Sequence, residues 1–233
     1  MIPWLLIPVK SLDSGKSRLL PLCNDNVRRD LNEYFLCQML LTASHFPGHE
    51  RTAVISDSEE VLRLVEICGA RAIHQTSAPG LNNAANEGLT VLRNLGAKDI
   101  LLIACDEPLV QPSDIREIVE QSAEGDAVVI CPDKHYTGTN AILVPAPVTI
   151  QFRFGENSCL EHCREVVRSG CFPKLHFNAN IAFDIDTPRD LAVWLNGYDA
   201  SANAIAAQSG ADLAMLRPAK ESLVAKCRTA GLL

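Results

Sequence analysis

The sequence predicts an α/β fold in which helices cover both faces of a mostly parallel central sheet that includes one antiparallel strand. Apolar runs alternate with helical patterns along most of the 233 residues, as in parallel strands joined by crossover helices. The run Ile100 to Ala104 is continuously aliphatic, as expected of a central strand buried on both faces. The run Ala141 to Val144 follows the preceding strand too closely for a crossover helix, so we expect it to turn back antiparallel.

The individual elements follow in order. Strands are predicted from about Leu5 and at Thr52 to Ser56, Arg71 to His74, Ile100 to Ala104, Ala127 to Cys131, Ala141 to Val144, Lys174 to Phe177 and Ala182 to Asp186. Helices are predicted at Val27 to Ser44, Ser58 to Gly69, Gly80 to Gly96, Ser113 to Ser122, up to Ser169 and from Thr187 onward. We expect an asparagine of the Gly80-Leu81-Asn82-Asn83 loop to cap the third helix, and Thr187 with Asp190 to open the last one.

Length and composition bound the domain organisation. A hydrophobic content of 47% is enough to bury a full core, and the composition becomes rich in alanine beyond Gly197. We therefore expect one domain over residues 1–197 and a helical extension over residues 198–233. The extension would pack on the core or on a partner subunit, which leaves a homodimer open.

Charge and cysteine content exclude some classes of protein. A net charge of −7 argues against a nucleic-acid or anionic-membrane surface. No apolar run approaches the roughly 18 residues of a membrane span and no signal peptide is evident, so we expect a cytoplasmic protein. Nine cysteines without a CxxC pair are expected to be reduced. Cys159, His162 and Cys163 have helical spacing, which we interpret as a packed helix face because zinc ligands usually occur in tighter pairs.

The stretch Leu5 to Leu19 carries the first candidate site. An apolar strand leads into a loop with Lys10, Lys16 and Arg18, and the loop after the first strand of such a sheet faces the ligand crevice. Cationic side chains beside backbone N–H groups suit a polyphosphate. The Gly-Lys-Ser sequence in this loop is not a Walker A motif, because the required earlier glycine is replaced by Lys10. A solvated loop with incidental lysines is the alternative.

Acidic residues provide the second half of the candidate site. Asp106 directly follows the central strand, and Asp184 and Asp186 would share one face of the last predicted strand. Mg²⁺ is typically bound by one or two carboxylates together with phosphate oxygens. Acids opposite the loop cations therefore predict a polyphosphate bridged by Mg²⁺. The alternative is that Asp184 and Asp186 only cap the following helix.

This combination of residues indicates nucleotidyl transfer, in which an acceptor oxygen attacks the α-phosphorus of a nucleoside triphosphate and pyrophosphate leaves. An ionised phosphate acceptor needs no protein base. Lys16 and Arg18 would neutralise the pyrophosphate, and Lys10 the transferred phosphate.

Two other classes of protein remain alternatives. A nucleotide-sugar glycosyltransferase also uses a DxD motif, but here the motif lies at the end of the domain and the chain is only 5% aromatic. A catalytically silent nucleotide-binding subunit would bind the nucleoside triphosphate without releasing pyrophosphate. The intact sets of cations and acids argue against it.

Six segments resemble one known family when they are taken together. IPVKSLDSGKSRL, VISD, GLNNA, PDKHYTGTNA, FRFGENS and DIDTP are similar, in order and spacing over about residues 3–195, to the 2-phospholactate/phosphoenolpyruvate guanylyltransferases of coenzyme F-420 biosynthesis. These enzymes belong to a wider group that includes the molybdenum-cofactor guanylyltransferases. The resemblance implies a Rossmann-like nucleotidyltransferase fold of the nucleotide-diphospho-sugar transferase type. It also implies that GMP passes from GTP to a small phosphorylated carboxylic acid: 2-phospholactate, phosphoenolpyruvate or 3-phosphoglycerate.

The resemblance assigns the nucleotide and metal residues. It implies that the triphosphate is bound by Lys10, Lys16 and Arg18, and that Mg²⁺ is held by Asp106 with Asp184 and Asp186, of which Asp186 is favoured. Asp57 and Asn82 are the candidates for guanine and ribose. The sequence CDEPLV departs from the usual DLPL form of the family, so that Glu107 adds a carboxylate that either faces solvent or alters metal binding.

The acceptor residues come from the same resemblance. It implies that the phosphate and carboxylate of the acceptor are held by Thr139, Asn140, Gly155 and Ser158, whose backbone N–H and hydroxyl groups are suitable anion donors. Arg153 and the Lys134-His135 pair are charged residues in the same segments that could read the acceptor carboxylate. The alternative is that Arg153, Lys134 and His135 are charged residues of exposed loops with no role in binding.

Overall fold

A seven-stranded sheet in the order β3-β2-β1-β4-β6-β5-β7 forms the centre of the protein. The structure is a computed structural model that describes residues 2–20, 23–123 and 127–195. The strands are β1 (Trp4–Pro8), β2 (Thr52–Ser56), β3 (Arg71–His74), β4 (Asp99–Ile103), β5 (Val128–Pro132), β6 (Thr139–Pro145) and β7 (Pro173–Leu175). The helices are η1 (Ser17–Leu19), α1 (Asp25–His45), η2 (His49–Arg51), α2 (Glu59–Ile67), α3 (Leu81–Asn94), α4 (Pro112–Ala123), α5 (Ser158–Arg168) and α6 (Ala179–Ala182).

Strand β6 is the antiparallel strand that the sequence predicts. It pairs antiparallel with β4 on one side and with β5 on the other, whereas β1 pairs parallel with β2 and β4. The β5–β6 register shifts between Cys131 and Pro132, so that Pro132 pairs with Thr139 and Cys131 with Ala141. Such a bulge re-aims the side chains near the end of a strand. The fold is therefore the mixed α/β type predicted.

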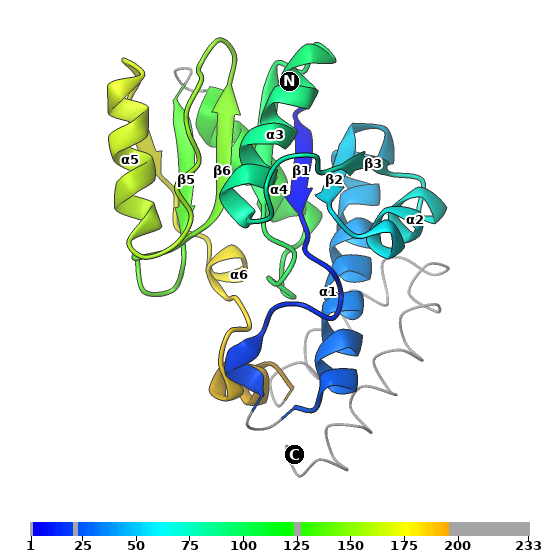
Figure 1. Cartoon of the computed structure of the whole chain (residues 1–233). Coiled ribbons are helices and arrows are strands. Elements are labelled where there is room, and N and C mark those ends of the chain that lie inside the picture. The colour runs from blue at the N-terminus through cyan, green and yellow to red at the C-terminus, as the bar shows by residue number, and fades with distance from the viewer. Residues whose placement is uncertain (1, 21–22, 124–126, 196–233) are drawn as a thin grey trace.

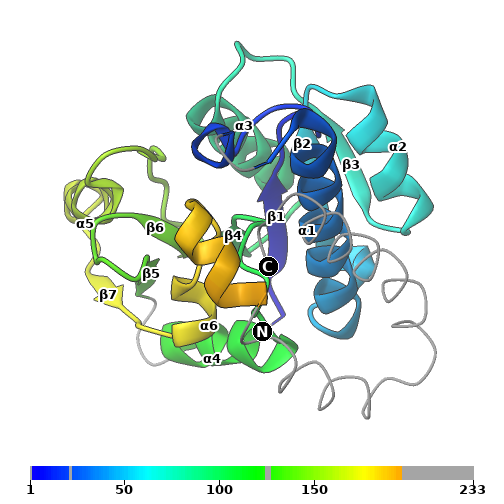
Figure 2. The ribbon, with the colours of Figure 1, turned by 90° about the horizontal axis from the view of Figure 1, so that it is seen from below.

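Two core clusters lie on opposite faces of the sheet. Alternate residues of each strand point to opposite faces, so Leu5 and Ile7 pack with α1, α2 and α4, whereas Leu6 packs with α3 and α5. Figure 2 shows α3 and α4 on opposite sides of β1 and β4, and Figure 1 shows α5 beside β5. A Cβ built on Gly88 of α3 would lie 2.7 Å from Leu6 Cδ1, so glycine allows α3 to pack directly on β1.

A third cluster joins the first loop to the end of the described chain. Leu19 of η1, Phe35 of α1, Ile185 and Trp194 are buried together, with the Phe35 and Trp194 rings 5.5 Å apart. Residues near both ends of the described chain are thus fixed relative to each other by apolar packing. This arrangement places the first loop and the Asp184–Asp186 segment at the same edge of the sheet.

The strand predicted at Ala182 to Asp186 is wrong. Ala182 ends α6, and the following segment pairs mainly with side chains and not with a neighbouring strand. Lys134 Nζ donates to Asp184 O at 3.1 Å, Lys16 Nζ donates to Ile185 O at 2.6 Å, and Asp186 N donates to Asp190 Oδ2 at 3.2 Å. Alternating acids and apolar residues predict a strand, but here side-chain hydrogen bonds satisfy backbone groups of the segment in place of a strand ladder.

Two cap predictions have opposite outcomes. Residues 188–195 are also helical, and Thr187 Oγ1 accepts from Asp190 N while Asp190 Oδ2 accepts from Thr187 N, so this helical segment opens with the expected capping box. The cap of α3 is instead Gly80, without a side-chain hydrogen bond, and Asn82 lies inside the helix. The asparagine cap is wrong because the Asn82 amide binds another segment, as described below.

The predicted extension over residues 198–233 lies outside the described residues. Within the described part of the chain, no helix combines the length and apolarity that a bilayer span requires.

Candidate active site

The loop after β1 is fixed by side chains of α1. Asn32 Nδ2 donates to Leu12 O at 2.7 Å and to Ser14 O at 3.0 Å, and an Arg28 guanidinium nitrogen donates to Gly15 O at 2.7 Å. These bonds hold the carbonyl groups of Leu12, Ser14 and Gly15 towards α1. Carbonyl oxygens turned away in this manner favour a loop that binds anions.

The loop cations pair with the acids that the sequence predicts opposite them. Lys16 Nζ lies 2.6 Å from Asp106 Oδ2, and the Lys16 side chain is only 6% exposed. Burial alone would lower the pKa of Lys16, but the Asp106 carboxylate outweighs burial and raises the pKa above its ordinary value. Lys16 therefore stays protonated. Arg18 contacts Asp186 at 3.1 Å in a more exposed pair.

The Asp184 carboxylate is tied to the β5–β6 loop. Lys134 Nζ lies 3.4 Å from Asp184 Oδ1 and 2.6 Å from Asp190 Oδ1. Burial raises the pKa of Asp184, Lys134 opposes the rise, and Asp186 and Asp106 add to it. Lys134 therefore anchors the acidic segment inside the protein, and its amine is engaged away from the acceptor segments.

The acids form an incomplete site for a divalent cation. Across residues 2–20, 23–123 and 127–195, no three His, Cys, Asp or Glu side chains converge closely enough to hold a metal ion by themselves. The two acidic segments are nevertheless adjacent, because Ile185 N donates to Asp106 O at 3.2 Å. Hard oxygen donors of this type suit a cation that takes its other ligands from phosphate. The residues fit a metal that arrives with a nucleotide.

Glu107 is buried and has no hydrogen-bond partner. It is 2% exposed, and neither carboxylate oxygen has a partner among the described residues. Burial raises its pKa well above the ordinary value, and the neighbouring Asp106 and Asp184 add to the shift. Of the two alternatives for this residue, exposure to solvent is therefore wrong.

Replacing Glu107 with leucine is expected to raise the free energy of unfolding by about 1 to 3 kcal/mol at about pH 8, because a buried polar group without a partner costs about that much. The pKa of Glu107 is higher in the folded state than in the unfolded state. Stability is therefore lost as pH rises from about 4.3 towards the folded-state pKa, and the gain from Glu107→Leu should shrink at about pH 5. Urea unfolding in EDTA at both pH values measures the difference.

The matched control for this prediction is Glu120→Leu, at an exposed position of α4. It should change the free energy of unfolding little, and by a similar amount at both pH values. A less stable Glu107→Leu protein at about pH 8 would mean that the ionised carboxylate has a stabilising partner in solution.

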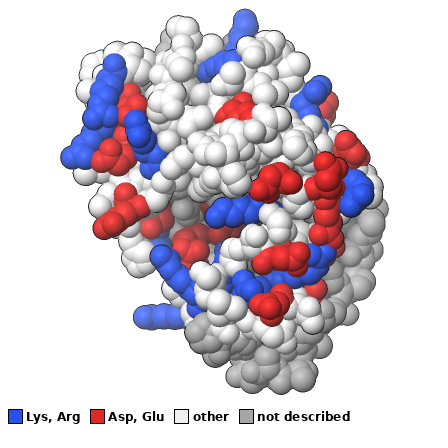
Figure 3. All heavy atoms as spheres, in the orientation of Figure 1, with Lys and Arg blue, Asp and Glu red and all other residues white. Residues whose placement is uncertain are grey.

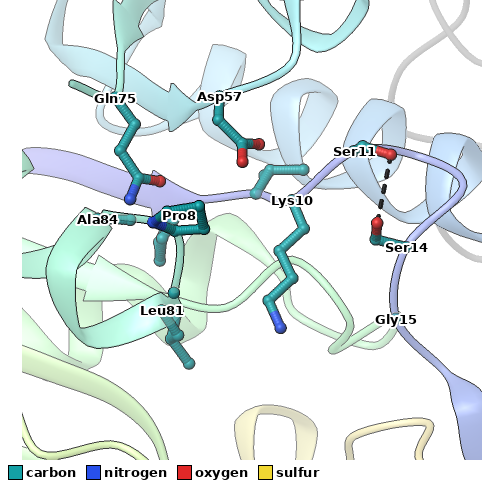
Figure 4. A pocket seen from close by; sticks show the side chains of 12 residues that line it. Pro8, Lys10, Ser11, Ser14, Gly15, Asp57, Gln75, Leu81 and Ala84 are labelled. Carbon is teal, nitrogen blue, oxygen red and sulfur yellow. Dashed lines mark hydrogen bonds between the residues drawn. The ribbon is translucent and has the colours of Figure 1, made fainter. Parts of the chain in front are cut away.

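A cavity of about 380 Å³ opens beside the first loop. It is lined by Pro8, Val9, Lys10, Ser11, Ser14, Gly15, Asp57, Gln75, Pro79, Gly80, Leu81 and Ala84. Figure 4 shows Lys10, Asp57 and Gln75 around this space. In the space-filling view, acidic and basic side chains are mixed around the hollowed part of this face (Figure 3). The cavity combines a cationic loop with hydrogen-bond acceptors.

Gln75 is a cavity residue that the sequence reasoning missed. Its Nε2 donates to Ser77 Oγ at 3.3 Å and to Ala78 O at 2.9 Å, which leaves Oε1 as an acceptor. Glu87 of α3 fixes the same loop. Burial would raise the pKa of Glu87, but hydrogen bonds from Thr76 and Ser77 outweigh burial and lower it to about 2.

The predicted acceptor residues gather where β6 begins and α5 begins. Thr139 Oγ1 lies 2.9 Å from His162 Nδ1, and Ser158 is the buried first residue of α5. Gly155 has a φ of 128°, a conformation that favours glycine, and its carbonyl accepts from Ser158 N at 3.2 Å. Asn140 is turned away, since its Nδ2 donates to Ile181 O at 2.9 Å in a buried bond.

Two further predicted residues are engaged by the protein itself. Arg153 is half exposed, and its Nε lies 3.6 Å from a Glu165 oxygen on α5. Asn82 Nδ2 donates to Phe154 O at 3.0 Å and Asn82 Oδ1 accepts from Phe154 N at 2.6 Å. Asn82 is not among the residues that line the cavity. The Asn82 amide therefore lies against the segment at Phe154, and its predicted contact with the nucleotide stays a prediction.

The packed helix face predicted around Cys159 is confirmed. Cys159 and His162 are buried, and Cys163 packs partly against the same core cluster as Cys159. The described cysteines are free thiols.

A mostly parallel α/β sheet with a cationic loop, an acidic edge and a cavity of about 380 Å³ beside the loop is the arrangement expected of a nucleotidyltransferase. The chain matches the family described as CofC-like guanylyl transferases over residues 4–223, and it belongs to this family. The match extends past residue 195, where the resemblance in sequence motifs ends.

Individual proteins agree with this assignment. The chain is 34% identical over 192 residues to the phosphoenolpyruvate guanylyltransferase of Rubrobacter xylanophilus, covering 82% of this chain and 93% of that one. It is 25% identical over 186 residues to the 2-phospho-L-lactate guanylyltransferase of Methanobrevibacter smithii, covering 80% of each. A crystal structure from Desulfovibrio desulfuricans G20, classed as a nucleotide-diphospho-sugar transferase, shares the fold with a TM-score of 0.67 at 16% identity, covering 97% of this chain and 99% of that one.

Proposed function

We propose that this protein transfers GMP from GTP to a small phosphorylated carboxylic acid and releases pyrophosphate, as a step of coenzyme F-420 biosynthesis. An oxygen of the acceptor phosphate attacks the α-phosphorus, and the bond from that phosphorus to the bridging oxygen of the pyrophosphate breaks. The leaving pyrophosphate keeps the bonding pair, and no proton has to be moved. The observation that carries the proposal is the pairing of Lys16 with Asp106 and of Arg18 with Asp186, in which both cations directly follow the loop residues from Lys10 to Gly15 that border the cavity.

The nucleotide half of the site is the cavity and the cationic loop. Lys10, Lys16 and Arg18 would bind the triphosphate, and Lys16 would neutralise the leaving pyrophosphate. Asp57 and the free Oε1 of Gln75 are acceptors, which suit the N1–H and N2–H₂ donors of guanine. Adenine would place the lone pair of its N1 against the Asp57 carboxylate. Two acceptors in the cavity wall therefore support GTP as the donor.

The acceptor half lies at the start of α5. The Thr139 hydroxyl, the Ser158 hydroxyl and the backbone N–H of Gly155 are donors for a phosphate or a carboxylate. Ser158 begins an 11-residue helix whose N-terminus carries a partial positive charge, which adds to their effect. Arg153 lies in the adjoining segment and pairs with Glu165. Its guanidinium would bind the second anionic group of the acceptor when this ion pair breaks.

Asp106, Asp184 and Asp186 would hold Mg²⁺ together with phosphate oxygens of the nucleotide. When bound, Mg²⁺ would neutralise charge on the phosphates as the bond to pyrophosphate breaks. The ion pair with Lys16 keeps Asp106 at this edge of the sheet, and Lys134 does the same for Asp184. The free thiols of the described residues support a reducing compartment, so we place the protein in the cytoplasm.

Similarity favours one acceptor among three. The relative named for phosphoenolpyruvate is 34% identical to this chain, and the relative named for 2-phospho-L-lactate is 25% identical. We therefore propose phosphoenolpyruvate as the acceptor.

The test is a product assay by mass with GTP, Mg²⁺ and phosphoenolpyruvate, 2-phospholactate and 3-phosphoglycerate in competition. A GMP adduct of phosphoenolpyruvate, formed with equimolar pyrophosphate, is the expected result. A GMP adduct of another acceptor would correct the acceptor alone. Stabilisation by GTP without pyrophosphate from any acceptor would identify a non-catalytic nucleotide-binding protein and overturn the proposal.

Replacing Asp57 with asparagine is expected to lower kcat/KM for GTP by about 10- to 100-fold, because a hydrogen bond to a charged group contributes about 1.5 to 3 kcal/mol. ITP lacks the 2-amino group of GTP, so the variant should also lose most of its preference for GTP over ITP. Initial rates with both nucleotides measure the change. Glu59→Gln, two residues away at an exposed position of α2, is the control and should keep both rates. An unchanged preference would remove Asp57 from the guanine site.

A further inference from the structure

The segment Phe152 to Phe154 belongs to no strand, and side chains from two helices accept hydrogen bonds from its N–H groups. Phe152 N donates to Asn86 Oδ1 at 3.0 Å, Arg153 N to His162 Nε2 at 2.9 Å, and Phe154 N to Asn82 Oδ1 at 2.6 Å. Three successive N–H groups thus alternate between α3 and α5. We call Asn82, Asn86 and His162 the clamp.

The spacing of the two asparagines matches the segment. Residues four apart on a helix are separated by about 6 Å along its axis, and residues two apart on an extended chain by about 6.6 Å. Asn82 and Asn86 therefore meet alternate N–H groups of the segment. Asn86 Nδ2 also donates to Asn82 O at 2.7 Å, which fixes the orientation of its amide. The clamp positions the residues that lead directly into Gly155.

The hydrogen bonds of His162 determine its tautomer. A backbone N–H only donates, so Nε2, which accepts from Arg153 N, carries no hydrogen. His162 is fully buried, and burial lowers its pKa to about 4, although Glu165 and Glu161 oppose this. The ring is therefore neutral, and its single hydrogen lies on Nδ1. Nδ1 donates to Thr139 Oγ1 at 2.9 Å.

The direction of this bond determines what Thr139 can do. Its oxygen accepts from His162, so its own hydrogen must point elsewhere, and no other hydrogen bond of Thr139 Oγ1 occurs among the described residues. The hydroxyl is thereby prepared to donate to an anion. Thr139 also lies near the start of α5, since Cys159 N donates to Thr137 O at 3.1 Å.

We propose that His162 is a positioning residue of the acceptor site, which holds the Phe152–Phe154 segment through Nε2 and orients the Thr139 hydroxyl through Nδ1 as a donor to the acceptor anion. The proposal rests on the proposed function, because it needs an anionic acceptor at Thr139 and Gly155. It gives a role to a histidine that the sequence indicates only as part of a packed helix.

Two conservative variants separate the two bonds of His162. A glutamine oxygen reaches the position of Nε2, so His162→Gln should keep the bond to Arg153 N and lose the donor to Thr139. An asparagine amide reaches the position of Nδ1, so His162→Asn should keep that donor and lose the bond to Arg153 N. We expect His162→Gln to raise the KM for the acceptor by about 10- to 100-fold, as for other bonds that orient a charged ligand, with the KM for GTP within about twofold. His162→Asn should retain more of the acceptor affinity.

A double-mutant cycle with Thr139→Val tests whether His162 acts through the hydroxyl. Valine keeps the shape of threonine, so His162→Gln should have little further effect on the KM for the acceptor in that background. Val166→Ala, a buried position of the same helix in the core, is the control for a merely loosened α5. It should lower the melting temperature and leave the KM for the acceptor unchanged. Additive effects in the cycle, or equal increases of both KM values, would overturn the proposal.

The nitrogen NMR spectrum of the His162 ring supplies a readout that does not need activity. A protonated Nδ1 and an unprotonated Nε2 at neutral pH are expected. The opposite tautomer would overturn the proposal in an active enzyme. A wild-type protein that forms no GMP adduct with any of the three acceptors would overturn the proposed function instead, and with it the role of His162 towards an acceptor.

Discussion

Alanine at position 16 is expected to lower kcat/KM for GTP by about 100- to 1,000-fold, the usual loss when one group that stabilises developing charge is removed. Lys16 is the buried cation of the site, and its Nζ lies 2.6 Å from both Asp106 Oδ2 and Ile185 O. Its pKa is raised, so the amine is charged at neutral pH and can balance the negative charge of the leaving pyrophosphate. The KM for the acceptor should change much less. Steady-state kinetics with each substrate varied in turn measures both effects.

The position of Arg18 predicts a weaker effect than that of Lys16. The Arg18 side chain is 72% exposed and its pair with Asp186 is screened by solvent, so Arg18→Ala should lower kcat/KM for GTP by about tenfold or less. Lys98→Ala, an exposed lysine before β4, is the matched control and should keep full activity. Thr139→Ala and Ser158→Ala should raise the KM for the acceptor and spare that for GTP. Equal effects of Lys16→Ala on both substrates would contradict this division of the site into two halves.

Apolar runs in the sequence predict most of the sheet. The run Ile100 to Ala104 is recovered as β4 one residue earlier, and the antiparallel β6 follows from the short distance to the preceding run. Burial on both faces leaves a local signal, because every residue of such a strand must be apolar. The segment from Ala182 to Asp186 imitates a half-buried strand. Its alternation instead separates acids that pair with Lys134 and Arg18 from Ile185, which is buried in the third cluster.

The candidate site is predictable only to the extent that motifs place residues at one sheet edge. That argument brings Lys16 near Asp106, although 90 residues separate them. It does not reveal the clamp, because the bonds of Asn82 and His162 depend on where α3 and α5 pack against the same extended segment. An asparagine in the first turn of a helix gives the same local signal as a cap. Gln75 was missed for a similar reason, since its free oxygen depends on how Ser77 and Ala78 turn.

Replacing Asp106 with asparagine is expected to lower kcat by on the order of 1,000-fold at saturating GTP and acceptor, which corresponds to about 4 kcal/mol of the barrier. Asparagine keeps the size of the side chain and removes the charge that would bind Mg²⁺. The Mg²⁺ concentration for half-maximal rate should rise as well. Asp99→Asn, at the opposite end of β4, is the matched control and should leave both quantities unchanged.

Asp106→Asn also changes the electrostatics of the acidic edge, and its effects on the reaction rate and on stability can be measured separately. Asp106 helps to raise the pKa of Glu107 and of Asp184, so its neutral replacement should let both carboxyls ionise at lower pH. Lys16 loses its carboxylate but keeps the bond to Ile185 O, which limits the cost of leaving its charge buried. Kinetics below the melting temperature of the variant therefore isolates the effect on the reaction. An Asp106→Asn protein with a reduced rate but an unchanged Mg²⁺ requirement would mean that Asp106 serves only to hold Lys16.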